Sequence, residues 1–113
     1  MQNQTFYKQL GKRIQVERER VGMSRERLAD RAEISSKFLY EIENGKKGFA
    51  CETFYKICKV LYVDPTYMLD GSNRLTDKSK IEYMIRDFDK KEMRYLIKLI
   101  EQVCILRNYS NGK

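Results

Sequence analysis

The sequence contains no histidine, so it lacks the side chain that most often serves in acid–base catalysis and metal binding near neutral pH. Its three cysteines, Cys51, Cys58 and Cys104, form no CxxC pair. We interpret Cys51 and Cys58, which are two helical turns apart, as small buried apolar residues. No glycine-rich phosphate loop is present, and no serine or cysteine has a plausible activating base. We therefore expect neither an enzyme nor a protein that binds a metal or cofactor.

The chain also lacks an apolar run long enough to span a bilayer, and "MQNQTFYKQL" lacks the basic start and apolar core of a secretion signal. We expect a cytoplasmic protein that does not bind membranes. Its 113 residues can bury one modest core, which favours one globular unit with an appendage. The net charge of +7 suits a polyanionic partner. Residues 1–73 carry 13 basic and 10 acidic side chains, and residues 74–113 carry 10 and 6, so the excess is spread out and is weak evidence alone.

With only one proline and six glycines, the chain has few breaks, and its apolar residues recur at intervals of three and four. This pattern predicts an all-α protein. The first helix is expected over about residues 6–21, with Thr5 as its N-cap and Gly22 as the left-handed residue that ends it. The residues of this helix that we expect to face inward are Phe6, Leu10, Ile14 and Val21.

Four shorter helices are expected to follow, over about residues 24–32, 35–44, 50–62 and 64–71. Their start signals are the N-cap residues Ser24, Ser35 and Asp64, and Pro65 at a first helical position. The second and third of the five helices meet at a three-residue corner. The small side chain of Ala29 lets them cross closely, while the opposite side of the third helix projects outward. This arrangement is the helix-turn-helix, which enters the DNA major groove.

Residues 10–70 resemble the Cro/C1-type (XRE family) of helix-turn-helix transcriptional regulators. The resemblance rests on three separate segments, "LGKRIQVERERVGMSRERLADRA", "ISSKFLYEIENGKKG" and "ETFYKICKVLYVDPTYML". It implies a five-helix, lambda-repressor-like DNA-binding domain over residues 1–70, with double-stranded DNA as its partner.

The resemblance also implies roles for individual residues. Positions that read base edges in the family are occupied by Ser36, Lys37 and Glu41, with Tyr40 beside them. Positions that bind phosphate, or that continue the loop along the DNA backbone, are occupied by Arg25, Asn44, Lys46 and Lys47. Arg18 matches a residue that can bind phosphate but that in some relatives pairs with the residue at the position of Glu43.

The chemistry of these side chains is compatible with such roles. Lys37 can donate to guanine, Glu41 can accept from the cytosine amino group, and the Tyr40 ring can meet a thymine methyl. The carboxylate of Glu41 needs a cytosine or a neighbouring cation, because it otherwise faces the charge of DNA. The alternative interpretation is that the basic residues form only a solvated face.

Two residues depart from the family's pattern. Arg25 occupies a position where glutamine is common in the family. Arginine can still donate a hydrogen bond to phosphate, but its side chain is longer than that of glutamine. Glu33 lies at a corner position where glycine is frequent, and a left-handed backbone there would cost about 1 kcal/mol.

Residues 71–76, "GSNRLT", are expected to link the DNA-binding domain to a helical oligomerisation segment over residues 77–113, in which Asp89 and Glu92 form a capping box. From Met93 to Leu106, ten of fourteen residues are apolar, which is too many for one helical stripe. We predict a two-helix hook that interlocks with that of a second chain; the alternative is a tail folded back on the first and fifth helices. The first helix of the hook is expected to contain Ile81, Met84, Ile85 and Phe88. The other predicted dimerisation residues are Met93, Leu96, Ile97, Ile100, Val103 and Cys104.

Taken together, these features predict a sequence-specific transcriptional regulator, a repressor that acts as a homodimer on operator DNA. The tail also resembles that of bacterial regulators of the SinR kind, whose hooks combine with those of a small antagonist protein. The alternative is an antitoxin or antirepressor-type interaction module, whose C-terminal helices bind a protein partner.

Overall fold

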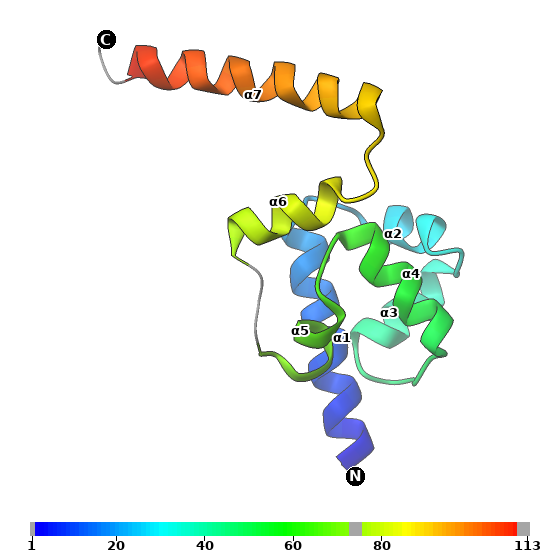
Figure 1. Ribbon diagram of the computed structural model, residues 1–113. Coiled ribbons are helices and arrows are strands. Elements are labelled where there is room, and N and C mark those ends of the chain that lie inside the picture. The colour runs from blue at the N-terminus through cyan, green and yellow to red at the C-terminus, as the bar shows by residue number, and fades with distance from the viewer. Residues whose placement is uncertain (1, 73–75, 111–113) are drawn as a thin grey trace. The chain divides into compact units, whose positions relative to one another are not determined.

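The computed structural model describes the backbone of residues 2–72 and 76–110, and over these residues it contains seven helices and no strand (Figure 1). The predicted all-α fold is therefore confirmed. The helices are α1 (Gln2–Arg20), α2 (Arg25–Arg31), α3 (Ser36–Glu43), α4 (Cys51–Leu61), α5 (Pro65–Asp70), α6 (Asp77–Ile85) and α7 (Lys90–Ser110).

The chain divides into two compact units, Met1–Lys80 and Ile81–Lys113, and α6 spans the division. The predicted domain limits, residues 1–70, 71–76 and 77–113, stay predictions, and residues 73–75 of the predicted linker lie outside the described part of the chain.

The first unit is built around α1, which packs against α3, α4 and α5, while α2 packs against α3 and α4 (Figure 1). Each of these helices contributes apolar side chains that are almost completely buried. Because the helices are short, this shared core rather than intrinsic helix propensity holds them together. The core consists of Leu10, Ile14, Leu28, Ala29, Ala32, Leu39, Ile42, Ile57, Cys58, Leu61, Val63 and Met68.

Local side chains fix where the helices start. Ser24 and Ser35 accept hydrogen bonds from the backbone N–H groups three residues later, at 3.1 and 3.0 Å, and Asp64 accepts one from Thr66 N at 3.1 Å. These caps, and Pro65 in the first turn of α5, were all predicted from the sequence. The predicted left-handed residue Gly22 is confirmed as well, with φ of 75°.

Three predictions about α1 are wrong. The helix begins at Gln2 rather than after Thr5, because no proline or glycine precedes Thr5 and an N-cap preference is too weak to end a continuing helix. Phe6 and Val21 are 39% and 46% exposed rather than inward-facing, since they lie near the two ends of a helix that extends past the core.

Two further predictions are corrected. Phe88 lies outside α6, which ends at Ile85; the capping box of Asp89 and Glu92, with N–H···O distances of 3.0 and 2.8 Å, starts α7 directly after Phe88. Cys51 is exposed at the first position of α4, whereas Cys58 is buried as expected. Burial, with a smaller contribution from Asp64, raises the pKa of Cys58 to about 12, so this thiol stays neutral near pH 7.

Two glycines let α3 approach α1 closely. A Cβ atom added at Gly11 would overlap the backbone oxygen of Ile42 and lie 2.8 Å from that of Glu43. A Cβ at Gly45, where φ is 70°, would lie 2.7 Å from the Cα of Lys8. The end of α3 and the residues after it therefore rest directly on the backbone of α1, and no larger residue fits between them.

We predict that Gly11→Ala destabilises the protein by about 1–3 kcal/mol, because the added methyl group must push two helix backbones apart. In a helix without such a contact, the same change would stabilise the protein by about 1 kcal/mol. A loss of stability therefore indicates the close contact between the two helices. Chemical denaturation followed by circular dichroism measures the difference. Gln9→Ala, on an exposed position of the same helix, is the control and should have little effect. A stabilised Gly11→Ala variant would contradict the close approach.

Candidate nucleic-acid interface

The corner between α2 and α3 has a defined backbone geometry. Glu33 adopts a left-handed conformation with φ of 62°, as its position at a glycine-like site predicted. Its N–H donates to Asp30 O at 3.2 Å and that of Ile34 donates to Ala29 O at 2.9 Å, which is the Schellman pattern for ending a helix. The side chain of Glu33 accepts a hydrogen bond from Lys56 on α4 at 2.8 Å, and this interaction lowers the pKa of Glu33. The corner is thus held by hydrogen bonds from both the backbone and α4.

On α3, buried and exposed residues alternate with the helical period. Leu39 and Ile42 are fully buried against the core, which fixes the rotation of α3 about its axis. The opposite side, which we call the reading face, carries the four residues predicted to read bases: Ser36, Lys37, Tyr40 and Glu41. The first three are exposed and Glu41 is half-buried. The structure therefore brings all four together on one side of α3.

Glu41 has a cationic neighbour. Its carboxylate lies 3.5 Å from the ammonium group of Lys47, in the loop after α3. The acid on the reading face is therefore partly neutralised within the protein, which reduces its repulsion of a polyanion.

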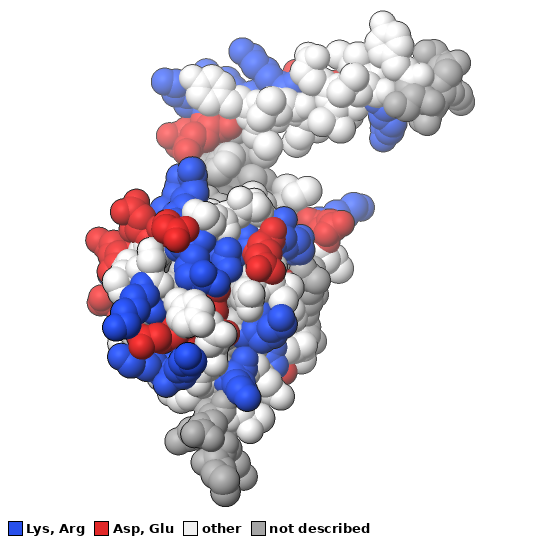
Figure 2. Space-filling model, turned by 180° about the vertical axis from the view of Figure 1, so that it is seen from behind, with Lys and Arg blue, Asp and Glu red and all other residues white. Residues whose placement is uncertain are grey.

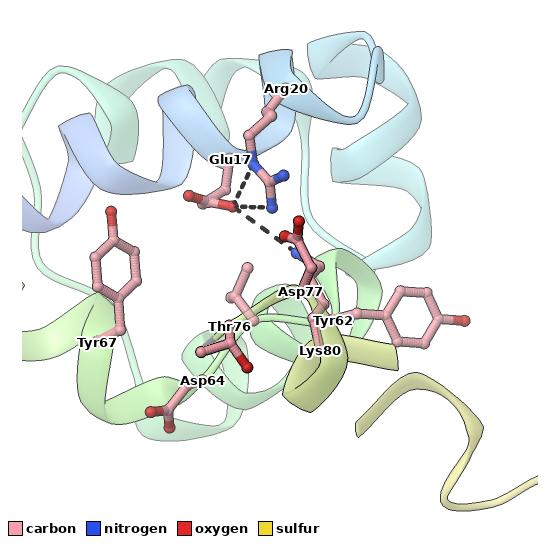
Figure 3. A pocket seen from close by; sticks show the side chains of 9 residues that line it. Glu17, Arg20, Tyr62, Asp64, Tyr67, Thr76, Asp77 and Lys80 are labelled. Atoms are coloured by element: carbon pink, nitrogen blue, oxygen red, sulfur yellow. Dashed lines mark hydrogen bonds and ion pairs between the residues drawn. The ribbon is translucent and has the colours of Figure 1, made fainter. Parts of the chain in front are cut away.

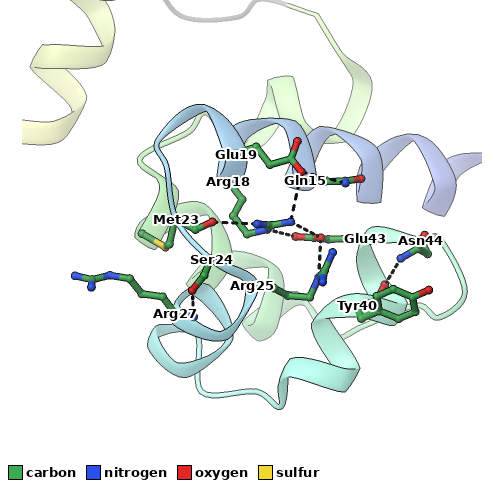
Figure 4. Close-up of polar contacts among 10 residues, drawn as sticks. All are labelled: Gln15, Arg18, Glu19, Met23, Ser24, Arg25, Arg27, Tyr40, Glu43 and Asn44. Atoms are coloured by element: carbon green, nitrogen blue, oxygen red, sulfur yellow. Dashed lines mark hydrogen bonds and ion pairs between the residues drawn. The ribbon is translucent and has the colours of Figure 1, made fainter.

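A buried carboxylate joins three helices behind the reading face (Figure 4). Glu43, at the end of α3, accepts hydrogen bonds from Arg18 of α1, through Nε at 2.7 Å and Nη2 at 3.0 Å. It also accepts one from Nε of Arg25, at the start of α2, at 3.2 Å. The third nitrogen of Arg18 donates to Met23 O at 3.0 Å. The hydrogen bond with Glu43 is the largest of the effects that raise the pKa of Arg18.

This network separates the roles of two predicted phosphate ligands. Arg18 is only 7% exposed, and all three of its guanidinium nitrogens donate to groups of the protein, so its geometry favours a structural role. Arg25 donates to Glu43 through Nε, and its side chain is 30% exposed, so part of the guanidinium group faces solvent. Its phosphate-binding role stays a prediction that the geometry supports.

The ring of Tyr40, on the reading face, contacts the cationic groups of two neighbouring residues. The guanidinium carbon of Arg25 lies 5.2 Å from its ring centroid and the ammonium nitrogen of Lys46 lies 5.4 Å from it, both within the range of cation–π attraction. The side-chain amide of Asn44 donates to Tyr40 O at 2.8 Å. Tyr40, predicted as a base reader, therefore contacts two predicted phosphate ligands, Arg25 and Lys46, through its ring, and Asn44 through its backbone carbonyl.

Further basic residues, which were not predicted from the sequence, lie near the end of α3. Lys8 and Lys12 are exposed on α1 and line a groove that also includes Asn44. Their spacing of four residues on one helix was visible in the sequence, but the expected pairing of Arg18 with Glu43 placed only the C-terminal part of α1 next to the end of α3. In the space-filling view, basic side chains, with some acidic ones among them, gather on the side of the molecule opposite the view of Figure 1 (Figure 2).

A separate pocket in the first unit has a different character (Figure 3). Glu17 is buried there, and its carboxylate accepts hydrogen bonds from Arg20 at 3.0 and 3.2 Å and lies 3.9 Å from the ammonium group of Lys80. Two cations thus compensate one buried acid, which fits a structural role in holding the start of α6 to α1.

Neither a metal centre nor a membrane span emerges from the part of the chain that the structure describes. No cluster of three or more potential ligand residues was found among these residues. None of the helices there is long and apolar enough to cross a bilayer.

Comparisons with known proteins agree with this geometry. Residues 11–74, more than half of the chain, match the model of a helix-turn-helix domain family, so the chain belongs to this family of XRE-type DNA-binding regulators. No curated protein matches the chain.

Several solved structures share the fold. The clp gene regulator ClgR from Corynebacterium glutamicum is 18% identical, with a TM-score of 0.55 over 96% of each chain. The SinR protein, in a structure of a SinR protein/SinI protein complex, is 23% identical, with a TM-score of 0.53 over 82% of this chain and 95% of that one. At such low identity these similarities establish the all-helical fold only.

We predict that Glu43→Gln lowers the free energy of unfolding by about 3 kcal/mol, because it removes the buried carboxylate that pairs with Arg18 and leaves the exposed Glu19, 3.9 Å away, as a weaker partner. Chemical denaturation measures this loss. Glu41→Gln makes the same substitution two residues away, in a pair whose lysine side chain is 58% exposed, and should cost less than about 1 kcal/mol. Equal losses in the two variants would show that the buried network does not support the fold.

Proposed function

We propose that the protein is a sequence-specific transcriptional repressor that binds operator DNA as a homodimer. The observation that carries this proposal is the reading face of α3, which is exposed, held in orientation by the Glu43 network and flanked by basic side chains. Membership of a DNA-binding regulator family supports the same conclusion and fits a non-enzymatic role.

The proposed binding mode places α3 in the major groove. Lys37 donates to guanine O6 or N7, Glu41 accepts from a cytosine amino group, and Ser36 and Tyr40 complete the base contacts. Arg25 lies at the N-terminal end of α2, where backbone amides also favour a phosphate. In this mode Asn44, Lys46 and Lys47, which follow α3, contact phosphates beyond its C-terminal end.

Dimerisation is proposed because one small DNA-binding unit contacts too few base pairs for high specificity. Two copies on a symmetric frame would bind two half-sites about one turn of DNA, roughly 34 Å, apart. The exposed apolar side chains of the tail support this, since Ile81, Ile97 and Ile100 are each about half exposed. The full set of proposed dimerisation residues is Ile81, Met84, Ile85, Phe88, Met93, Leu96, Ile97, Ile100, Val103 and Cys104.

The second candidate is an interaction module whose tail binds a different protein, such as a small antagonist that carries its own helical hook. One of the structural neighbours, SinR, was solved in a complex with the SinI protein, which supports this candidate. A stoichiometric partner that co-purifies with the protein and releases it from DNA would favour an antirepressor or antitoxin role.

We predict that Lys37→Ala relaxes sequence preference, with a loss of about 1–3 kcal/mol on the preferred duplex and little loss on random DNA. Arg25→Ala should instead weaken binding to all duplexes alike, because it removes a phosphate contact. The preferred duplex is first obtained by selecting bound fragments from random DNA, and both variants are then titrated by fluorescence anisotropy. Lys37 is not a base reader if Lys37→Ala loses affinity equally on preferred and random DNA.

We also predict that Lys12 of α1 adds a phosphate contact. Replacing it with alanine should reduce the slope of log K against log salt concentration by about 0.9, as expected for one contact fewer on B-DNA. The measurement is a salt titration on a duplex of random sequence. Lys59→Ala, an exposed lysine of α4, removes the same charge and should leave the slope unchanged. If both variants lower the slope equally, Lys12 contributes only through net charge.

A further inference from the structure

A second apolar stripe runs along α7, in addition to the predicted dimerisation residues. Its members recur at alternating intervals of four and three, which places them on one side of an α-helix. At about 100° per residue, this stripe lies roughly 165° around the helix from the stripe that contains Met93, Ile97 and Ile100. The second stripe consists of Tyr95, Leu99, Gln102, Leu106 and Tyr109.

The second stripe is strongly exposed. The exposed fractions of its four large side chains are 56% for Tyr95, 65% for Leu99, 64% for Leu106 and 74% for Tyr109. It contains no charged residue. The described residues of the unit Ile81–Lys113 leave these side chains more than half exposed, and a stripe of four large apolar side chains in water marks an interaction surface.

The order of residues along the stripe points to its occupant. Read in either direction, the stripe is tyrosine, leucine, glutamine, leucine, tyrosine, with Gln102 at the centre. If a second copy of α7 lies antiparallel, Tyr95 meets the partner's Tyr109, Leu99 meets the partner's Leu106, and Gln102 meets the partner's Gln102. An antiparallel two-fold contact pairs each residue before the centre with one after it, and the mirrored order makes these pairs alike. A parallel contact would be compatible with any order, so it does not account for the mirrored one.

The central glutamine supplies a reason for one register. A side-chain amide both donates and accepts, so two such amides at a two-fold axis can donate to each other. Any shift of one helix along the other would place each amide against leucine or tyrosine and leave it without that partner. One polar residue in an apolar seam sets register in this way in paired helices.

We propose that the second stripe of α7 is a homotypic interface, in which two copies of the chain pair antiparallel about Gln102. This inference rests on the homodimer of the proposed function and specifies a contact within it. The stripe with Met93, Ile97 and Ile100, on nearly the opposite side of α7, remains for the interlocked hook. The two stripes together account for a helix that is apolar around more than half of its circumference.

Disulfide cross-linking tests the centre of the proposed contact. Cys51 and Cys104, both exposed, are first replaced by serine, and the buried Cys58 is kept. Gln102→Cys should then form a disulfide-linked dimer under mild oxidation, because a two-fold axis at this position brings the two Cα atoms into bonding range. The product is a dimer-sized band on a non-reducing gel that disappears on reduction. Glu101→Cys lies on the adjacent exposed position of α7 and points to another side. This variant should form no disulfide link and should run as a monomer on the same gel.

A second pair of variants tests the direction. In the same background, a mixture of the Tyr95→Cys and Tyr109→Cys chains should cross-link with each other, whereas each variant alone should cross-link much less. Efficient cross-linking of Tyr95→Cys with itself would mean a parallel contact and would overturn the proposal.

Light scattering of the wild-type chain separates the possible failures. If the chain is a dimer but Gln102→Cys cross-links no better than Glu101→Cys, the proposed interface is wrong and the homodimer stands. If the chain stays monomeric at high micromolar concentration, the homodimer and the interface both fail.

Discussion

The arrangement of the first three helices depends on the hydrogen bonds that the carboxylate of Glu43 accepts from two arginines. The carboxylate is fully buried and receives hydrogen bonds from Arg18 of α1 and Arg25 of α2, so one side chain at the end of α3 connects three elements. A buried acid is tolerated only when such partners surround it. The same network holds Arg25 beside Tyr40, and it thereby sets the position of a cation relative to the reading face.

Backbone contacts add a second constraint, on the distance between helices rather than their orientation. Gly11 allows the carbonyl groups at the end of α3 to rest against α1, and Gly45 allows the following loop to do the same. The left-handed Glu33 fixes the corner before α3. With both ends of α3 held and its apolar side buried, the reading face is presented by a rigid element. Such preorganisation favours binding, because little conformational freedom remains to be lost.

Much of this could be predicted from the sequence, because the relevant signals are local. Ser24, Ser35 and Asp64 act on backbone groups two or three residues away, and their caps were predicted correctly. The helical period also placed the reading face on the outside of α3. What could not be predicted depends on contacts between distant segments. Gly11 has no sequence signal of its own, since its importance comes from the carbonyl of Ile42.

The candidate site was predicted in part for the same reason. Its residues on α3 follow from one motif, whereas the position of Tyr40 between Arg25 and Lys46 requires the three-dimensional fold. The buried pair of Arg18 and Glu43 was expected from the family resemblance, and the structure adds Arg25 to it. The tail was identified from its excess of apolar residues, but the second stripe on α7 was not separated from the first, because composition does not distinguish the sides of a helix.

The central claim is that the reading face of α3 meets DNA. NMR titration of the isotope-labelled protein with a duplex selected from random DNA tests it most directly, because each backbone amide reports on its own surroundings. The account predicts that the largest chemical-shift changes occur from Ser36 to Lys47 and around Arg25. Changes confined to α7, with the amides of α3 unaffected at saturation, would contradict it.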